Sequence, residues 1–278
     1  MAALMQLQVD ISRKIFRSFE ESGQIVALEN VRFAANVGEF LCILGPSGCG
    51  KTTLLNIVAG LDSNFEGAVS FKTFVDTEHF VQDAYDHREK TPESSRGNSG
   101  SRDRELRIGY VFQNPRLLPW RTVEENLRLV LSSEQIQSGI IDKLLTSAEL
   151  EAFRNTYPSQ LSVGMQRRVS LIRAFSIQPD LLVMDEPFVS LDKRMEDNLH
   201  QVLLDYWHSS KPSILFVTHH INEALKLASR LLVFSSRPGT LILDIPVELT
   251  YPERNTPEIF RDFVTQLSEE YPEIRQIN

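Results

Sequence analysis

Short apolar runs bounded by turn residues recur along the chain, and they predict the strands of an α/β fold. The runs at 40–44, 181–184 and 214–217 are apolar at every position. Such runs are typical of strands that a parallel sheet buries on both faces. We expect further strands at 7–9, 25–33, 68–71 and 108–112, and a hairpin joining 231–234 to 240–245.

Helix-compatible segments alternate with these strands and gather in one part of the chain. Both 122–131 and 135–156 have a helical pattern, with Thr122 placed as an N-cap. We therefore expect a helical subdomain over about 116–178, inserted into the α/β pattern. The other predicted helices are those at 51–59, 162–177, 190–207 and 258–267.

The segment 83–107 differs in character, because it is rich in Ser, Gly, Arg, Asp and Glu. Such a composition buries too little apolar surface to offset the entropy of ordering. We expect a flexible surface loop there. Its charges of both signs favour solvation over a binding patch.

One stretch joins a buried strand to a helix through a glycine-rich turn. It reads Gly45-Pro46-Ser47-Gly48-Cys49-Gly50-Lys51-Thr52-Thr53. Backbone N–H groups of such a turn point into one concavity, the helix N-terminus adds partial positive charge, and Lys51 supplies an ammonium. The pattern predicts a triphosphate cradle, with Lys51 on the β- and γ-phosphates and the Thr52 hydroxyl on Mg²⁺. A glycine-rich turn without a ligand is the alternative, which the complete G-x-x-x-x-G-K-T spacing disfavours.

Polar residues follow two other buried strands at their carboxyl ends, where open α/β sheets place their ligands. Asp185 and Glu186 follow the strand at 181–184, and His219 follows the strand at 214–217. We expect Asp185 to orient Mg²⁺, Glu186 to accept a proton from an attacking water, and His219 to donate a hydrogen bond to a γ-phosphate. Solvated acids and a surface histidine are the alternative interpretation.

Three weaker patterns leave alternatives open. Phe16 lies upstream of the cradle, where a ring can stack on a purine, but a core phenylalanine fits the local pattern better. The loop 114–120 combines two prolines with Trp120, which suits a partner-facing loop and a buried turn equally. The Ser-capped helix start at Ser162 is commonplace by itself.

Composition narrows the possible partners. The net charge of −8 and the pI of about 5.4 argue against nucleic acid. The sequence has no apolar run of eighteen residues and no basic-then-apolar start, so we expect the protein to remain in the cytosol. Its cysteines, Cys42 and Cys49, are too few for a disulfide framework. We expect the Cys49 thiol, beside Lys51 at a helix N-terminus, to be reactive, and Cys42 to be inert.

The motifs occur together in an order that resembles the ATP-binding subunit of an ABC transporter over residues 7–245. They are the cradle, Gln113 at a strand end, Leu161-Ser162-Val163-Gly164, Asp185-Glu186, Ser190-Leu191-Asp192 and His219. The resemblance implies that Phe16 stacks on adenine and that Gln113 links Mg²⁺ and water to the membrane subunit. It also implies that Ser162 and Gly164 cap the partner's γ-phosphate, that Glu186 is the general base, that Asp192 makes a cross-dimer contact and that His219 senses the γ-phosphate.

Within this family, several shorter sequence features are similar to those of the importers that serve nitrate, sulfonates, taurine and related small solutes. They are the residues at 111–114 and 117–120, Met165, and Arg237-Pro238-Gly239. The chain departs from the family pattern at two positions. Val163 replaces the usual signature glycine, which makes it a candidate cause of slow turnover, and His220 stands where an acid commonly follows the sensor histidine.

We therefore expect a P-loop NTPase α/β fold with a mostly parallel sheet, an antiparallel β subdomain and an inserted helical subdomain. The ATP-binding domain is assigned to 1–245 and a C-terminal tail to 246–278. The resemblance implies hydrolysis of ATP with Mg²⁺, pairing of two copies, binding to integral membrane permease subunits, and indirect cooperation with a periplasmic or lipoprotein solute-binding protein. It places the protein peripherally at the cytoplasmic face of the membrane. The alternatives are a soluble ABC ATPase acting on a macromolecular complex and a low-turnover nucleotide-binding regulatory subunit.

Overall fold

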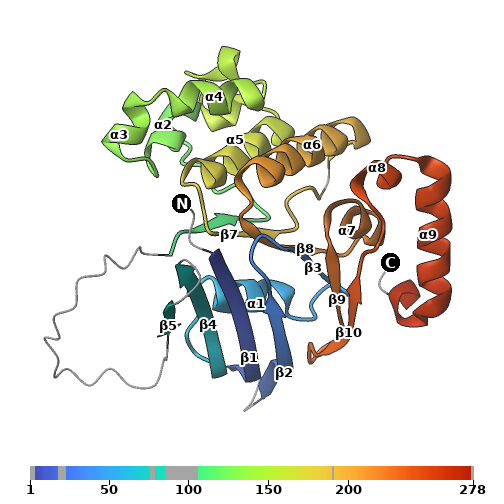
Figure 1. Cartoon of the computed structure of the whole chain (residues 1–278). Coiled ribbons are helices and arrows are strands. Elements are labelled where there is room, and N and C mark those ends of the chain that lie inside the picture. Colours follow the sequence, from blue (N-terminus) through green and yellow to red (C-terminus); the bar gives the residue numbers. More distant parts are fainter. Residues whose placement is uncertain (1–3, 18–22, 76–78, 86–105, 190, 277–278) are drawn as a thin grey trace, which may run out of the picture.

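Two sheets with a helix between them form the framework of the protein (Figure 1). The computed structural model describes residues 4–17, 23–75, 79–85, 106–189 and 191–276, and these contain a four-stranded and a six-stranded sheet. The antiparallel sheet has the order β2-β1-β4-β5, formed by β1 (Leu4–Arg17), β2 (Gln24–Ala35), β4 (Glu66–Val75) and β5 (His79–Tyr85). The larger sheet has the order β10-β9-β3-β8-β7-β6, formed by β3 (Phe40–Leu44), β6 (Ile108–Val111), β7 (Leu181–Asp185), β8 (Ser213–Thr218), β9 (Arg230–Phe234) and β10 (Leu241–Pro246). All its neighbouring strands are parallel except β9 and β10, so the predicted fold class is confirmed.

The parallel strands are buried on both faces, as their unbroken apolar sequence predicts. Along β3, Leu41 and Ile43 belong to the core that contains α1 (Lys51–Val58) and the antiparallel sheet. Phe40 and Cys42 point the other way, into the core shared with the helices above the sheet. The alternation of side chains along a strand therefore joins two hydrophobic cores through one sheet.

The helical subdomain lies on the far side of the large sheet from the antiparallel sheet (Figure 1). It contains α2 (Val123–Arg128), α3 (Ser133–Gln137), α4 (Ile140–Ser147) and α5 (Val163–Ser176). The prediction of one helix over 135–156 is wrong. Gly139 has φ of 73° and Glu149 has φ of 56°, and these left-handed residues interrupt the run before and after α4. Thr122 caps α2 as predicted, in a capping box with Glu125.

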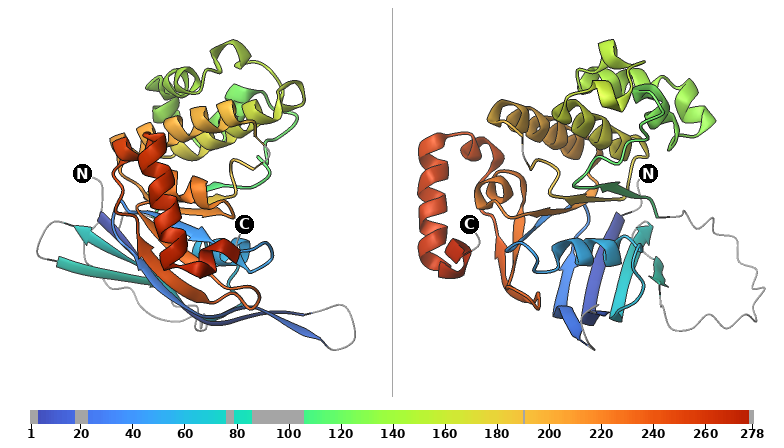
Figure 2. Two further views of the ribbon diagram at one scale, coloured as in Figure 1. Left: turned by 90° about the vertical axis from the view of Figure 1, so that its right-hand side faces the viewer. Right: turned by 180° about the vertical axis from the view of Figure 1, so that it is seen from behind.

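Four further helices complete the described part of the fold. They are α6 (Lys193–Ser210), α7 (Ile221–Leu227), α8 (Tyr251–Arg254) and α9 (Pro257–Glu270). Of these, α6 packs beside α5 (Figure 1). Figure 2 shows α8 and α9 on the side of the molecule opposite β5. Leu267 of α9 and Ile274 beyond it are buried in the main core, so this part of the tail packs onto the domain. Among the described residues, no helix combines the length and apolarity needed to cross a bilayer.

Several predicted boundaries change. The strands predicted at 7–9, 25–33 and 68–71 exist but are longer, because backbone pairing continues beyond their most apolar residues. The predicted start of the loop at residue 83 is wrong, because 83–85 belong to β5. The centre of the predicted loop, 86–105, lies outside the described residues. Ser190, which was expected to start a helix, also lies outside them, and α6 begins after Asp192.

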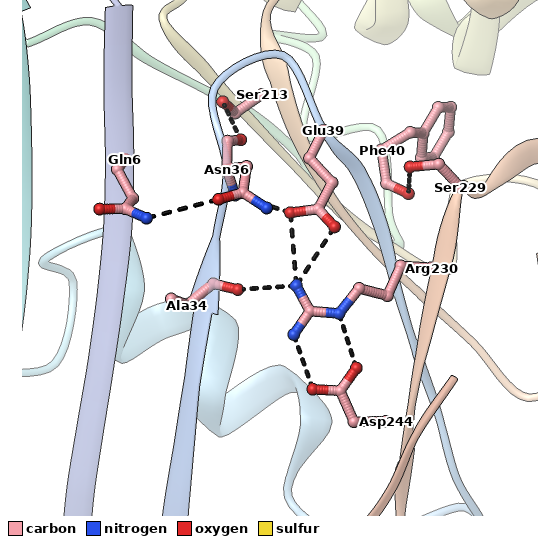
Figure 3. Close-up of polar contacts among 9 residues, drawn as sticks. All are labelled: Gln6, Ala34, Asn36, Glu39, Phe40, Ser213, Ser229, Arg230 and Asp244. Carbon is pink, nitrogen blue, oxygen red and sulfur yellow. Dashed lines mark hydrogen bonds and ion pairs between the residues drawn. The ribbon is translucent and has the colours of Figure 1, made fainter. Parts of the chain in front are cut away.

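An arginine-centred network connects the two sheets (Figure 3). Arg230 on β9 donates from Nε and Nη2 to the two carboxylate oxygens of Asp244 on β10, both at 2.6 Å. Its Nη1 donates to the carbonyl of Ala34 on β2 at 3.0 Å and to Glu39 Oε1 at 3.2 Å. One side chain thereby connects an edge hairpin, the antiparallel sheet and the turn that leads into β3.

Candidate functional site

The glycine-rich loop connects β3 to α1 and folds around the ammonium of Lys51. Gly48 and Gly50 have φ of 78° and 104°, backbone conformations that residues with a Cβ rarely adopt. A Cβ on Gly50 would also lie 2.8 Å from the carbonyl of Ala27. Lys51 donates from Nζ to the carbonyls of Gly45 at 2.6 Å and Pro46 at 2.9 Å. The loop therefore folds back over the lysine ammonium, and a glycine-rich turn of this kind can present its backbone N–H groups to phosphate.

A cleft of about 490 Å³ opens beside this loop. That volume falls within the range of small-molecule sites. The cleft collects residues from both sheets, the loop and α1, and most were predicted for one site: Phe16, Ile25, Ala27, Ser47, Gly48, Gly50, Lys51, Thr52, Thr53, Gln113, Glu186 and Arg237. The lining does not include the other three loop residues, Gly45, Pro46 and Cys49. The Cys49 N–H donates to the Pro46 carbonyl, a hydrogen bond within the loop.

Two side chains with oxygen atoms that can ligate a metal ion meet beside the cleft. Thr52 Oγ1 donates to Asp185 Oδ1 at 3.2 Å, although the two residues are far apart in the sequence. Asp185 is only 5% exposed, and its burial, together with the charge of Glu186, raises its pKa. A hydroxyl and a desolvated carboxylate fit a hard divalent cation such as Mg²⁺, which would neutralise the carboxylate.

Glu186 lies at the centre of a second set of contacts. Its Oε2 accepts from Gln113 Nε2 at 3.3 Å, and its Oε1 lies 3.1 Å from His219 Nδ1. The residue has φ of 44°, an uncommon value for a non-glycine residue. The structure thus brings together three predicted residues from the ends of different strands.

Phe16 forms part of the open wall of the cleft and is 43% exposed. Its strand partner Ile25 lines the same wall and is 37% exposed. The ammonium of Lys14 lies 4.8 Å from the centre of the Phe16 ring. The core-residue alternative for Phe16 is therefore wrong, because the ring faces a cleft rather than the interior.

Three predicted residues belong neither to the glycine-rich loop and its cleft nor to the contacts around Asp185 and Glu186. Ser162 caps α5 by accepting from the Met165 N–H at 3.2 Å, and Asp192 caps α6 by accepting from the Met195 N–H at 3.0 Å. Gly164 is buried against α6, where an added Cβ would lie 1.6 Å from the sulfur of Met195. The first turns of α5 and α6 therefore pack directly on each other. Val163, between the cap and the glycine, is 58% exposed.

Two arginines that the sequence analysis left without a role hold the site in place. Arg237 donates from Nε and Nη2 to the carbonyl of Gly48 at 3.1 and 3.0 Å. Arg167 on α5 donates to the carbonyl of Pro187 at 2.6 Å, directly after Asp185-Glu186. The Arg237-Pro238-Gly239 turn in the sequence is the signal that could have identified Arg237. This turn packs against the glycine-rich loop, since a Cβ on Gly239 would lie 2.1 Å from the Cys49 carbonyl.

The expected reactivity of Cys49 is wrong. Its side chain faces the core and is 1% exposed, although its backbone belongs to the loop. Burial raises the pKa of the thiol more strongly than the nearby charge of Lys51 lowers it. The predicted inertness of Cys42 agrees with its complete burial and its raised pKa.

Known proteins share both the sequence pattern and the fold. A family model described as "ABC transporter" matches residues 28–189. The aliphatic sulfonates import ATP-binding protein SsuB of Bacillus anthracis is 34% identical over 254 residues, covering 91% of each chain. The nitrate import ATP-binding protein NrtD of Synechocystis sp. is 33% identical over 271 residues, covering 92% of each. The solved dimer of the ATP-binding cassette MJ0796, in a post-hydrolysis state with ADP and Pi, superposes with a TM-score of 0.65 at 28% identity, covering 87% of this chain and 99% of that one.

Proposed function

This chain belongs to the ABC transporter family, and we propose that it is the ATP-hydrolysing subunit of an importer for a small solute such as nitrate, a sulfonate or taurine. One observation carries the ATPase part of the proposal, namely that the loop around Lys51 shares one cleft with Gln113 and Glu186, and that Glu186 is in contact with His219. The solute class is supported by SsuB and NrtD, whose names assign them to sulfonate and nitrate import.

In the proposed site, the backbone N–H groups of residues 47–53 and the Lys51 ammonium bind the phosphates of ATP. Phe16 stacks on the adenine. Thr52, Asp185 and Gln113 would hold Mg²⁺, which supplies neutralising charge for the phosphate oxygens when bound.

Hydrolysis then requires a positioned water and a base. Glu186 Oε1 accepts a proton from the water as its oxygen bonds to the γ-phosphorus, and the bond from that phosphorus to the ADP oxygen breaks. His219 donates to a γ-phosphate oxygen, and its contact with Glu186 keeps both groups oriented. ADP and inorganic phosphate are the products.

Two copies are proposed to complete two sites. Ser162 and Gly164 of one copy would cap the γ-phosphate bound by the other, and Asp192 would contact the partner copy. This arrangement accounts for the position of these residues outside the cleft of their own chain. Permease subunits and a solute-binding protein would complete the importer, with this subunit peripheral at the cytoplasmic membrane face.

Glu186→Gln tests the ATPase assignment. The amide keeps the shape of the carboxylate but cannot accept the proton, so the hydrolysis rate should fall by about 10²–10⁴-fold. Nucleotide affinity, measured by calorimetry, should stay within a few-fold of wild type. Glu134→Gln, an exposed change on α3, is the matched control and should retain full activity. A Glu186→Gln rate close to that of this control would refute the assignment of the base.

The importer assignment needs a separate measurement. The purified chain, reconstituted in vesicles with its permease and solute-binding protein, should drive ATP-dependent uptake of a radiolabelled sulfonate or of nitrate. Full ATPase activity without uptake of either class would overturn the proposed solutes and leave the ATPase assignment standing.

A further inference from the structure

A second cleft, of about 720 Å³, lies between α6 and α7 on one side and α8 and α9 on the other. None of its lining residues belongs to the nucleotide cleft. Four of the side chains that line this cleft can ligate metal ions. They are Glu196, Asp197 and His200 on α6, and Glu223 on α7.

His200 is the unusual member of this group. Its side chain is 7% exposed, and its Nε2 atom is buried without a hydrogen-bond partner in the described part of the chain. The edge-to-face contact with Phe188, at 4.7 Å between ring centres, fixes the imidazole plane. Buried polar atoms are nearly always hydrogen-bonded, so an orphaned ring nitrogen calls for a missing ligand.

The surroundings of Nε2 are arranged for a cation. Glu223 Oε1 lies 3.7 Å from it and Glu196 Oε1 lies 3.9 Å from it. Ligand atoms of Glu196, Asp197 and His200 all lie within 4.8 Å of one another. Glu223 is itself 7% exposed, and its other oxygen accepts a hydrogen bond from the Thr218 hydroxyl.

A lysine ammonium already occupies the outer edge of this group. Lys193 Nζ lies 2.8 Å from Glu196 Oε1 and 3.2 Å from Asp197 Oδ1. Its side chain is 62% exposed, so it can swing into solvent when another cation arrives. Lys226 lies farther away, at 3.7 Å from Asp197.

We propose that His200, Glu196, Asp197 and Glu223 form a binding site for a divalent transition metal ion of the Zn²⁺ class. One imidazole nitrogen with carboxylate oxygens is a donor set that Zn²⁺ accepts, whereas Mg²⁺ favours oxygen ligands alone. Tetrahedral bonds of about 2.0–2.1 Å put neighbouring donors about 3.3–3.4 Å apart. The separations of His200 Nε2 from Glu223 and Glu196, 3.7 and 3.9 Å, therefore need to close by about 0.3–0.6 Å when the ion binds. Glu223 also has to approach the other carboxylates, because it is outside the set of ligand atoms that all lie within 4.8 Å of one another.

Calorimetric titration of the metal-free, nucleotide-free full chain with zinc chloride tests this site. Wild type should bind about one Zn²⁺ and unfold at a higher temperature with it. Because no nucleotide is present, the result is independent of the proposed ATPase function. Magnesium chloride at the same concentrations should produce neither binding nor stabilisation.

Substitutions on α6 locate the binding. The double variant Glu196→Gln and Asp197→Asn changes partly or fully exposed groups and should weaken Zn²⁺ binding by at least about tenfold. Lys193→Ala should tighten binding, because it removes the competing ammonium. Asp205→Asn, an exposed carboxylate on the same helix, is the control and should leave binding unchanged.

His200→Gln should abolish binding, with its unfolding temperature in the absence of metal reporting whether the buried change is tolerated. If that variant does not fold, the double variant and Lys193→Ala still decide the question. No Zn²⁺ binding by wild type would overturn the proposal. Equal affinity in wild type, the double variant and Lys193→Ala would do the same by placing the ion elsewhere.

Discussion

At the scale of single residues, the site concentrates charge that its own chain does not fully compensate. Asp185 is buried beside Glu186 and receives one hydrogen bond, from Thr52. Its raised pKa means that the native state holds the carboxyl proton more tightly than the unfolded chain does. This residue therefore destabilises the nucleotide-free protein at neutral pH.

Asp185→Asn should raise the thermal unfolding midpoint of the nucleotide-free protein by about 1–4 °C while weakening binding of Mg-ATP. The sign follows from linkage. Below the pKa that Asp185 has in the unfolded chain, the carboxyl is protonated in both the folded and the unfolded protein, so wild type and variant should have similar stability. As the pH rises through the raised native pKa, wild type becomes less stable relative to the variant. Scanning calorimetry at several pH values measures this difference. A variant less stable than wild type at neutral pH would show that the carboxylate is well compensated.

The sequence predicts chemistry at this scale better than it predicts accessibility. The positions of Lys51, Thr52, Asp185 and Glu186 followed from motif spacing, because that spacing fixes the loop and the strand ends. The orientation of Cys49 did not, since it depends on which loop side chain turns toward the core.

At the scale of elements, the contacts of Arg230 explain how an edge hairpin is held to the rest of the fold. Hydrogen bonds to Asp244 and to Glu39 raise the pKa of Arg230, so its guanidinium stays charged throughout the accessible pH range. The planar group reaches two carboxylates and a carbonyl at once, which a lysine cannot do.

Arg230→Met should lower the free energy of unfolding by about 1–3 kcal/mol, the scale of hydrogen bonds to charged groups. Arg230→Lys is the matched control, which keeps the charge and should recover only part of the loss. Urea unfolding gives both values, and a cycle with Asp244→Asn isolates the coupling of that pair. If the methionine variant were as stable as wild type, the network would contribute nothing net.

Element boundaries were predictable where a local signal existed. Gly139 offered such a signal, because glycine commonly ends a helix, but the prediction of one helix over 135–156 did not use it. Glu149 offered none, since its left-handed backbone is imposed by the surrounding packing. The length of β1 depends on pairing with β2 and β4, which are distant contacts that a local pattern does not contain.

At the scale of the whole molecule, the separation of Gly164 from Lys51 leads to an experiment on the proposed pair of copies. Lys51→Ala and Gly164→Asp are placed either on different chains or on one chain of a heterodimer. In a head-to-tail pair, lesions on different chains both fall in one interface site and leave the other intact. Lesions on one chain damage both sites.

The heterodimer with lesions on different chains should therefore retain more ATPase activity at saturating Mg-ATP. Both species contain the same substitutions, so their composition is matched. Because Gly164→Asp also meets Met195 in its own chain, the unfolding temperatures of both species must agree before rates are compared. Higher activity from the doubly mutated chain paired with wild type would place each complete site within a single chain.

The contact between Gly164 and Met195 also constrains how this sequence can diverge. The methionine sulfur fills the space where a Cβ would lie, so a larger residue at 164 requires the Met195 side chain to move. A descendant that acquires alanine at 164 should retain its packing only with a smaller or differently directed side chain at 195. Substitutions at positions 164 and 195, which lie thirty-one residues apart in the sequence, should therefore tend to occur together across evolution.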